Sequence, residues 1–302
     1  MPTRRRMMIA IACATLLPAA SARAQERLHV IASFSILGDL VRNVGGERVQ
    51  VGILVGPNGN AHVYAPSPGD ARSVADAKLV FVNGLGFEGW LERLVKASGT
   101  KAPIIVATKG IKPRERVGER GHDHDHGTAD PHAWQSVANA KVYVANIRDA
   151  MIAADPAGKD VYAANAAAYL ARLDALEREV REVIAKVPAD RRRVITSHNA
   201  FGYFQDAYGV AFTAPQGVST EAEASARDVA AIITQIKKQK IPAVFLENVT
   251  DPRLLQQIAR ETGAKIGGTL YSDALTDDKG DATTYIDLIR HNLKQLAAAL
   301  ES

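Results

Sequence analysis

The feature that most constrains the fold is a long helical run in the middle of the chain. Residues 163–187 read AANAAAYLARLDALEREVREVIAKV, with apolar positions at helical spacing and no Gly or Pro before Pro188. Ala, Leu, Glu and Arg are strong helix formers, so the run predicts one continuous helix, which we place at 159–187. Its apolar side is expected to pack on a core, and its length suits a connection between two units.

The segments on either side of this helix alternate between strand-like and helix-like patterns. Before it, strand-like runs at 28–31, 49–54, 79–82 and 104–107 alternate with helix-like runs such as 36–44 and 87–97. After it, strand-like runs at 194–196 and 243–246 alternate with helix-like runs at 227–240, 252–262 and 282–300. Such alternation is typical of an α/β fold with parallel sheets.

The pattern therefore predicts two similar lobes with central parallel sheets flanked by helices, joined by one long linking helix. We expect an N-terminal α/β lobe over 25–158 and a C-terminal α/β lobe over 188–302. A chain of this length exceeds one typical core, which agrees with two units.

The first 24 residues have the three parts of a secretory signal peptide. Arginines at positions 4–6 precede an apolar run over 7–20, and Ala22-Arg23-Ala24 precedes Gln25. The apolar run is too short to anchor the chain in a bilayer. We therefore expect cleavage near Gln25 and a soluble periplasmic protein. Cys13, in the sequence AIAC, is an alternative lipid-attachment signal, although the apolar segment before it is short.

Composition narrows the chemistry of the exported chain. Four of its 37 basic residues lie in the leader, which leaves 33 basic against 33 acidic residues. This balance removes the compositional argument for a nucleic acid or an anionic membrane as partner. The single cysteine, Cys13, also leaves with the leader. Any metal site must then use imidazole, carboxylate and water, which excludes iron–sulfur clusters and cysteine zinc sites.

Four of the eight histidines fall within eleven residues. His122, His124 and His126 alternate with aspartates in the tract GHDHDHG, and His132 follows in the turn DPHAW. The tract has too few apolar groups to fold alone, so it predicts a solvated loop over about 115–129 that collects metal ions weakly. The alternative is a flexible linker whose histidines are dispensable.

Four turns place a ligand-type side chain where a strand ends or a helix begins. They are GPNGNAHVYAP at 56–66, DPHAW at 130–134, SHNAFGYF at 197–204 and YSDAL at 271–275. In open α/β domains, loops beyond the carboxyl ends of the strands converge on one cleft. A solitary turn histidine is usually structural, but turns from two lobes that converge are candidates for one metal site.

These motifs resemble those of a known family. AHVYAPSPGD, DPHAW with Asn139 behind it, SHNAFGYF and the late YSDAL are similar, in order and along the whole mature chain, to motifs of the metal-binding substrate-binding proteins of ABC importers, the zinc/manganese group called cluster A-I. NGLGFE at 83–88 and FLE at 245–247 also look like that family. The resemblance implies a bilobed protein that binds one divalent transition metal and delivers it to a membrane permease.

The resemblance also implies which residues hold the ion. Carried over to this chain, the ligands are His62, His132, His198 and Asp273. In the family, manganese binders often have Glu at the position of His198, whereas zinc binders have His. Groups behind the ligands should orient the imidazoles, or else serve as caps and turns. The candidates for that role are Asn60, Asn139 and Glu247.

The chemistry of this set independently favours zinc. Three neutral nitrogens and one oxygen suit four-coordinate Zn(II), whereas Mn(II) favours oxygen-rich sites with more ligands. Cu(II) and Ni(II) also bind imidazole tightly. If Asp273 were bidentate, the fifth contact would weaken the preference for zinc, and manganese or iron would again be candidates.

We therefore expect an extracytoplasmic zinc-binding protein without enzymatic activity. It would hold Zn(II) in one tight inter-lobe site, with a weaker ion at the histidine tract. The expected partner is a cognate ABC permease in the inner membrane, with a periplasmic metallochaperone as a second candidate, no nucleic acid, and a monomeric state. The alternatives are a manganese- or iron-binding member of the same group, and a metal buffer or adhesin with the same fold.

A rival from another class is a secreted zinc-dependent hydrolase, since three histidines and an open fourth position are also a catalytic arrangement. The chain has no H-E-x-x-H motif and no evident carboxylate placed as a general base.

Overall fold

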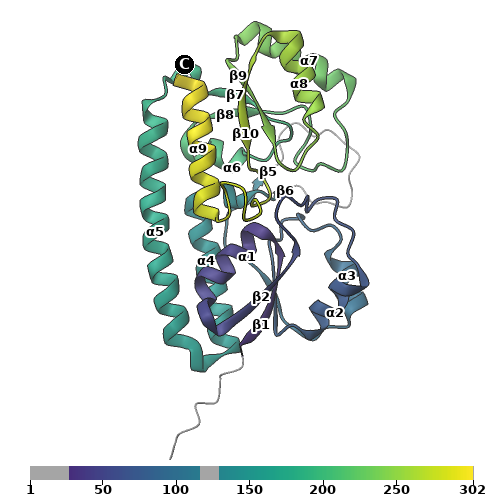
Figure 1. Ribbon diagram of the computed structural model, residues 1–302, viewed down its shortest axis with the longest axis vertical. Coiled ribbons are helices and arrows are strands. Elements are labelled where there is room, and N and C mark those ends of the chain that lie inside the picture. The colour runs from purple at the N-terminus through teal and green to yellow at the C-terminus, as the bar shows by residue number, and fades with distance from the viewer. Residues whose placement is uncertain (1–26, 116–128, 302) are drawn as a thin grey trace, which may run out of the picture.

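The computed structural model describes residues 27–115 and 129–301. Figure 1 shows two α/β lobes arranged along the long axis of the molecule, with the helix α5 running along one flank of both. The predicted signal peptide at 1–24 and the histidines His122, His124 and His126 lie outside the described residues.

The N-terminal lobe is built on a four-stranded parallel sheet. Its strands are β1 (Leu28–Phe34), β2 (Val49–Val55), β3 (Leu79–Val82) and β4 (Ile104–Val106), in the order β2-β1-β3-β4. The helices between them are α1 (Ser35–Gly45), α2 (Pro68–Asp76) and α3 (Leu91–Ser98). β3 is buried at every position, as expected for an apolar strand covered on both faces.

The C-terminal lobe repeats this arrangement. Its strands are β7 (Arg193–Ile195), β8 (Ala211–Thr213), β9 (Ala243–Glu247) and β10 (Lys265–Leu270), all parallel in the order β10-β9-β7-β8. Its helices are α6 (Gly202–Tyr208), α7 (Ala226–Gln239) and α8 (Arg253–Thr262). A separate antiparallel pair joins β5 (Arg114–Glu115) to β6 (Ala129–Asp130).

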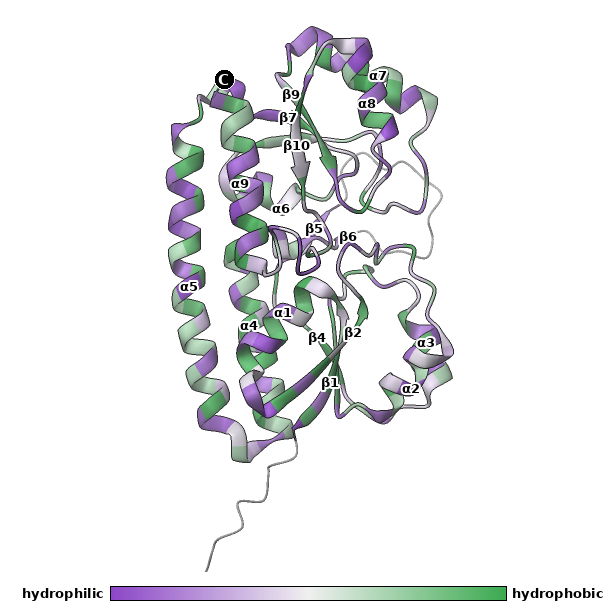
Figure 2. Cartoon of the chain, viewed as in Figure 1, coloured by the Kyte–Doolittle hydropathy of each residue, from purple (hydrophilic) through white to green (hydrophobic). Residues whose placement is uncertain are grey.

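Three helices connect the lobes along one flank. They are α4 (Val137–Ala154), α5 (Lys159–Lys186) and α9 (Tyr285–Glu301). Short 3-10 turns lie at Gly46–Arg48, Ala133–Gln135, Pro156–Gly158 and Ala189–Arg191. The predicted long helix is present as α5, which is 28 residues long and buries one apolar stripe while its other side is mostly hydrophilic (Figure 2). The predicted fold class is thereby confirmed.

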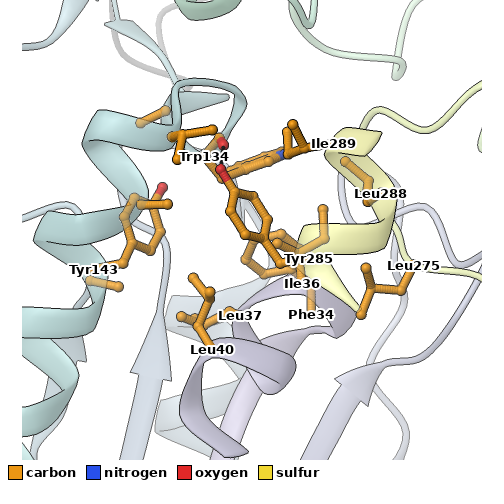
Figure 3. Close-up of a cluster of buried hydrophobic side chains, with 14 of the residues drawn as sticks. Phe34, Ile36, Leu37, Leu40, Trp134, Tyr143, Leu275, Tyr285, Leu288 and Ile289 are labelled. Atoms are coloured by element: carbon orange, nitrogen blue, oxygen red, sulfur yellow. Dashed lines mark hydrogen bonds between the residues drawn. The ribbon is translucent and has the colours of Figure 1, made fainter. Parts of the chain in front are cut away.

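The largest apolar core extends through both lobes rather than stopping at either. It includes Phe34 of β1, Leu37 of α1, Trp134 in the turn before α4, and Tyr285 and Ile289 of α9 (Figure 3). A smaller core lies between α7, α8 and the C-terminal sheet and includes Ile195 and Leu255. The lobes are therefore fastened by shared apolar packing on the flank formed by the three helices.

Two helices begin later than the sequence pattern predicts. α3 starts at Leu91 instead of 87: Gly84, Leu85 and Gly86 have positive φ values of 85°, 56° and 78°, and the turn they begin continues to residue 90, where the Glu88 carboxylate accepts from the main-chain N of Asn83 and Gly84. α9 starts at Tyr285 instead of 282. No helix within 27–115 and 129–301 is long and apolar enough to cross a membrane.

Candidate metal centre

Four side chains from four separate turns meet between the two sheets. His62 follows β2, His132 follows β6, His198 follows β7 and Asp273 follows β10. Each offers one ligand atom, and these atoms all lie within 4.8 Å of one another. His62 is 5 % exposed and the other three are fully buried. The structure thus brings together all four residues that the resemblance implied as ligands.

The distances show that the three imidazoles present the same nitrogen, Nε2, to a common centre. His62 Nε2 lies 3.3 Å from His132 Nε2. The carboxylate of Asp273 faces all three rings, with Oδ2 at 3.4 Å from His62 and 3.2 Å from His198, and Oδ1 at 3.5 Å from His132. Neither oxygen of Asp273 has a hydrogen-bond partner within the described residues. A buried carboxylate without such partners fits a bound cation.

His132 is held from behind by Asp130, a residue that our sequence prediction missed. Asp130 Oδ1 accepts from the main-chain N of His132 at 3.0 Å and lies 2.8 Å from its Nδ1. Because Nδ1 is engaged, Nε2 is free to face the centre. Asp130 also pairs with Arg114 at 3.4 Å. The spacing Asp-Pro-His was the available signal, since Asp commonly accepts from the main chain two residues later in a turn.

His198 is held in the same way by Glu247, one of the candidate supporting residues named from the sequence. Glu247 Oε1 accepts from the main-chain N of Ser197 at 2.7 Å and of His198 at 2.9 Å. Its Oε2 lies 2.6 Å from His198 Nδ1. β9 ends at Glu247 and β7 is its neighbour in the sheet, so the parallel pairing brings the carboxylate beneath the His198 turn.

His62 depends on main-chain contacts instead of a carboxylate. Asn60 Oδ1 accepts from the His62 main-chain N at 3.0 Å, and the Trp90 indole donates to the carbonyl of Ala61 at 2.7 Å. The ring of Phe87 packs edge-on against the His62 ring at 4.8 Å. These contacts fix the turn, whereas the third predicted supporting residue, Asn139, donates to the carbonyl of Ala133 at 3.2 Å and acts on the His132 turn only indirectly.

The protonation states follow from burial and from these carboxylates. Burial lowers the pKa of His62 to about 4, despite the opposing effect of Asp273. Burial also disfavours the charged form of His198, but the charges of Glu247 and Asp273 outweigh it and hold its pKa well above the ordinary value. Burial would raise the pKa of Asp273, but His198 and His132 hold it well below its usual range. At neutral pH and without metal, these shifts favour the neutral imidazole at His62 and the imidazolium at His198.

Aromatic rings close the walls of the site. Trp134 lies 5.3 Å from the His132 ring and 4.9 Å from Phe87. Its indole donates to the carbonyl of Ser272 at 2.8 Å, directly before Asp273. These buried rings therefore shield this side of the site from solvent, which strengthens coordination. Within the described residues, this is the one group of three or more histidine or acidic side chains arranged to hold an ion.

A buried site of imidazoles and a carboxylate between two α/β lobes defines the class of metal-binding substrate-binding proteins that serve ABC importers. Residues 30–299 match the family described as "ZnuA: Zinc-uptake complex component A periplasmic". The chain belongs to this family.

Relatives of the chain carry names for different metals. The manganese-binding lipoprotein MntA of Halalkalibacterium halodurans is 34 % identical over 276 residues, which is 91 % of this chain and 89 % of the relative. The iron-binding protein YfeA of Yersinia pestis is 34 % identical over 272 residues, covering 90 % and 86 %.

Solved structures similar to this chain also carry the names of different metals. The periplasmic zinc binding protein TroA from Treponema pallidum matches with a TM-score of 0.84 and 28 % identity, covering 91 % of this chain and 99 % of that one. A manganese-bound periplasmic metal binding protein from Candidatus Liberibacter asiaticus matches with a TM-score of 0.79 and 31 % identity, covering 91 % and 100 %. The family is thus established, and the metal is not decided by likeness alone.

Proposed function

We propose that this protein captures Zn(II) between its lobes and hands it to a cognate ABC permease. The ligands would be His62, His132, His198 and Asp273. The observation that carries the proposal is the donor set itself, in which three Nε2 atoms and one carboxylate converge in a buried centre. Asp130 and Glu247 would fix the tautomers of two ligands, and Asn60 the turn of the third.

The spacing of the donor atoms supports zinc. A tetrahedral ion with bonds of about 2.0–2.1 Å separates its ligand atoms by about 3.3–3.4 Å. Four contacts between donor atoms lie near this spacing, at 3.3 Å between His62 and His132, 3.4 and 3.2 Å from Asp273 Oδ2 to His62 and His198, and 3.5 Å from Oδ1 to His132, within a set that spans at most 4.8 Å. Nitrogen-rich coordination also disfavours Mn(II), which prefers oxygen ligands.

A manganese or iron cargo is the second candidate. It is supported by the relatives named for those metals and by the orientation of Asp273, whose two oxygens both face imidazoles. A bidentate carboxylate would give five donors, a number compatible with either metal.

The rest of the proposal concerns export and organisation. The chain would be cleaved near Gln25 and act in the periplasm as a monomer, with units at 25–158 and 188–302 joined by 159–187. Its partners would be the permease and, as a second candidate, a periplasmic metallochaperone. His122, His124 and His126 would bind a further ion weakly and pass it to the main site when zinc is scarce.

We also propose that the protein is not an enzyme. Its relatives are named as binding and transport proteins. The carboxylates nearest to the centre, Asp130 and Glu247, already hold ligand imidazoles, so neither is available as a general base.

Competition titration of metal-free protein tests the choice of metal. Zn(II), Mn(II) and Fe(II) are each titrated against a chromophoric chelator, and one tight equivalent of zinc bound far above the other two is expected. Tighter binding of Mn(II) or Fe(II) than of Zn(II) would favour the second candidate. Absence of tight binding by all three would reject a metal-carrying role.

A further inference from the structure

A groove lies between α2 and α3 on the N-terminal lobe, away from the metal centre. It has a volume of about 710 Å³. Small and apolar side chains of both helices line it, including Ala71, Ala75, Leu94 and Ala97, and Trp90 lies at its base. In Figure 1 the two helices lie on the side of the molecule opposite α5. The groove is therefore on a face that the connecting helices leave free.

Two arginines give the groove its charge. Arg72 of α2 and Arg93 of α3 both line it and are both exposed. Neither has a hydrogen bond or ion pair with any residue in 27–115 or 129–301. Some arginines of the described residues are paired, such as Arg48 with Asp155 at 2.8 Å and Arg290 with Glu179 at 2.9 Å, whereas others, such as Arg227 and Arg260, also have no such partner there. Two unpaired guanidinium groups beside an apolar groove suit a partner that brings carboxylates together with apolar side chains.

The base of the groove is connected to the metal centre. The indole of Trp90 donates to the carbonyl of Ala61, the residue before His62, at 2.7 Å. The ring of Tyr64 packs on the Trp90 ring at 5.1 Å, and residues 65–68 of the same turn form one wall of the groove. An occupant would therefore contact the side chains that fix the His62 turn.

We propose that this groove is a docking surface for an extracytoplasmic segment of the permease that carries Asp or Glu beside apolar residues. The apolar side chains would enter the groove and the carboxylates would pair with Arg72 and Arg93. Because Trp90 contacts both the groove and the His62 turn, docking would shift the balance between holding and releasing the ion. This inference rests on the proposed delivery of metal to a permease. Coupling of this kind is reciprocal, so metal loading would in turn change the affinity for the permease.

Charge reversal tests the proposal without touching a metal ligand. In the cell of origin, the chromosomal copy is replaced by an Arg72→Glu/Arg93→Glu variant, and uptake of radiolabelled zinc, or of the metal that the purified protein binds most tightly, is measured. We expect the uptake rate to fall at least about tenfold, the change that 1.4 kcal/mol of lost binding produces. Metal affinity of the purified variant should remain within about twofold of the original, since a factor of two is less than 0.5 kcal/mol.

The matched control is Lys78→Glu/Lys101→Glu, which makes the same charge change with exposed residues of this lobe that do not line the groove. Its uptake should equal that of the original. Normal uptake by the arginine variant, or equal loss in the control, would overturn the proposal. A protein that binds metal but whose deletion leaves uptake unchanged would instead refute the proposed delivery.

A second variant fills the groove without changing charge. Ala97→Trp places a large ring at an exposed position of α3 that lines the groove. Loss of uptake with unchanged metal affinity and an unchanged unfolding temperature would support docking in the groove. Normal uptake by this variant would show that the apolar part of the groove is not occupied, and would overturn the proposal in its present form.

Discussion

At the scale of single residues, the centre depends on which ring nitrogen each histidine presents. Asp130 and Glu247 lie at Nδ1 of His132 and His198, at 2.8 and 2.6 Å, so both rings offer Nε2. The His62 turn is held through its main chain by Asn60 and Trp90. Of the three imidazole ligands, two are therefore held by carboxylates and one by main-chain contacts. Substitution of these supporting groups should change metal affinity by different amounts.

The first prediction concerns His132. Replacing this fully buried ring by Ala removes one of four donors and the contact between Asp130 and the imidazole. Loss of a group that merely supports a ligand costs about 10–100-fold in metal affinity, so loss of the ligand should cost at least about 100-fold. Competition titration measures the effect. The control is His29→Ala, at a histidine outside the centre, and equal affinities of His132→Ala and the original would refute the assignment.

The second prediction concerns proton release. His198 carries a proton in the metal-free protein because its pKa is raised, and the metal must displace that proton from Nε2, whereas His62, with a pKa of about 4, has none to lose at neutral pH. Metal affinity should therefore fall as pH falls through the neutral range. Calorimetry in two buffers of different ionisation enthalpy should show about one proton released per ion.

Glu247→Gln provides the comparison for this prediction. It removes the charge that raises the pKa of His198, so fewer protons should be released at pH 7. The matched control Glu223→Gln changes an exposed carboxylate and should behave as the original. Unchanged proton release in Glu247→Gln would contradict the account of His198.

At the scale of elements, the turn after β2 both carries a ligand and bridges the lobes. The main-chain N of Asn58 donates to the carbonyl of Leu275 at 2.8 Å. The side-chain amide of Asn60 donates to Thr220 Oγ1 at 2.8 Å and to the carbonyl of Val249 at 3.2 Å. One short turn of the N-terminal lobe thus contacts three loops of the C-terminal lobe, so opening these contacts would separate the lobes beside His62.

The third prediction is that Thr220→Val speeds metal release. This near-isosteric change removes the hydrogen bond across the cleft but keeps the bond between Asn60 and the His62 main chain. A hydrogen bond is worth about 0.5–1.5 kcal/mol, so the dissociation rate should rise about 2- to 10-fold. Stopped-flow chelator capture measures it, with Thr234→Val on the exposed face of α7 as control. An unchanged dissociation rate would mean that this contact does not limit release.

The fourth prediction concerns the strained turn at 84–86. Glu88 is buried and accepts from Ser33 Oγ at 2.6 Å and from the main-chain N of Asn83 and Gly84 at 2.6 and 3.1 Å. Glu88→Ala leaves these three donors unsatisfied, so the free energy of unfolding should fall by about 3 kcal/mol in urea titrations. Glu92→Ala, at an exposed carboxylate, should change it by less than about 0.5 kcal/mol. Equal stability of the two variants would contradict this role of Glu88.

The turn at 84–86 also shows which parts of the fold could not be predicted from the sequence. Periodicity predicted a helix from 87, but the turn that begins at 84–86 continues to residue 90, so α3 starts at Leu91 and Phe87 packs against His62 from this turn. Apolar runs and helix formers predicted the central strands and α5, because both signals are local. β10 was missed, because its only strongly apolar stretch is short and two glycines, Gly267 and Gly268, interrupt it.

The candidate site also has parts that the sequence predicts and parts that depend on the folded structure. His62, His132, His198 and Asp273 were named through the resemblance of whole motifs, and the structure brings them together. Asp130 was missed although the Asp-Pro-His spacing predicts its bond to the His132 main-chain N, because its contact with His132 Nδ1 also depends on the turn conformation. The role of Asn139 stays indirect, since its position at the start of α4 directs its amide to Ala133.

At the scale of the whole molecule, the lobes share one apolar core to which α4, α5 and α9 all contribute. Figure 1 shows these helices along one flank, and Figure 3 shows part of the core around Phe34, Trp134 and Tyr285. The metal centre forms only when both lobes are folded, because each lobe supplies two of the four ligands. The fifth prediction is one cooperative thermal transition that zinc shifts upwards. At a free concentration 100 times Kd, a ligand adds about 2.7 kcal/mol of stability. Calorimetry measures this shift, and the control variant His132→Ala should show no comparable shift. Two separate transitions would contradict a shared core.

The central claim is that one zinc ion sits among four named side chains. Crystals of protein purified without added metal, measured with X-rays above and below the zinc absorption edge, test it most directly. We expect one anomalous peak bonded to Nε2 of the three histidines and to the carboxylate of Asp273. Manganese or iron in that position, or zinc only elsewhere in the protein, would contradict the account.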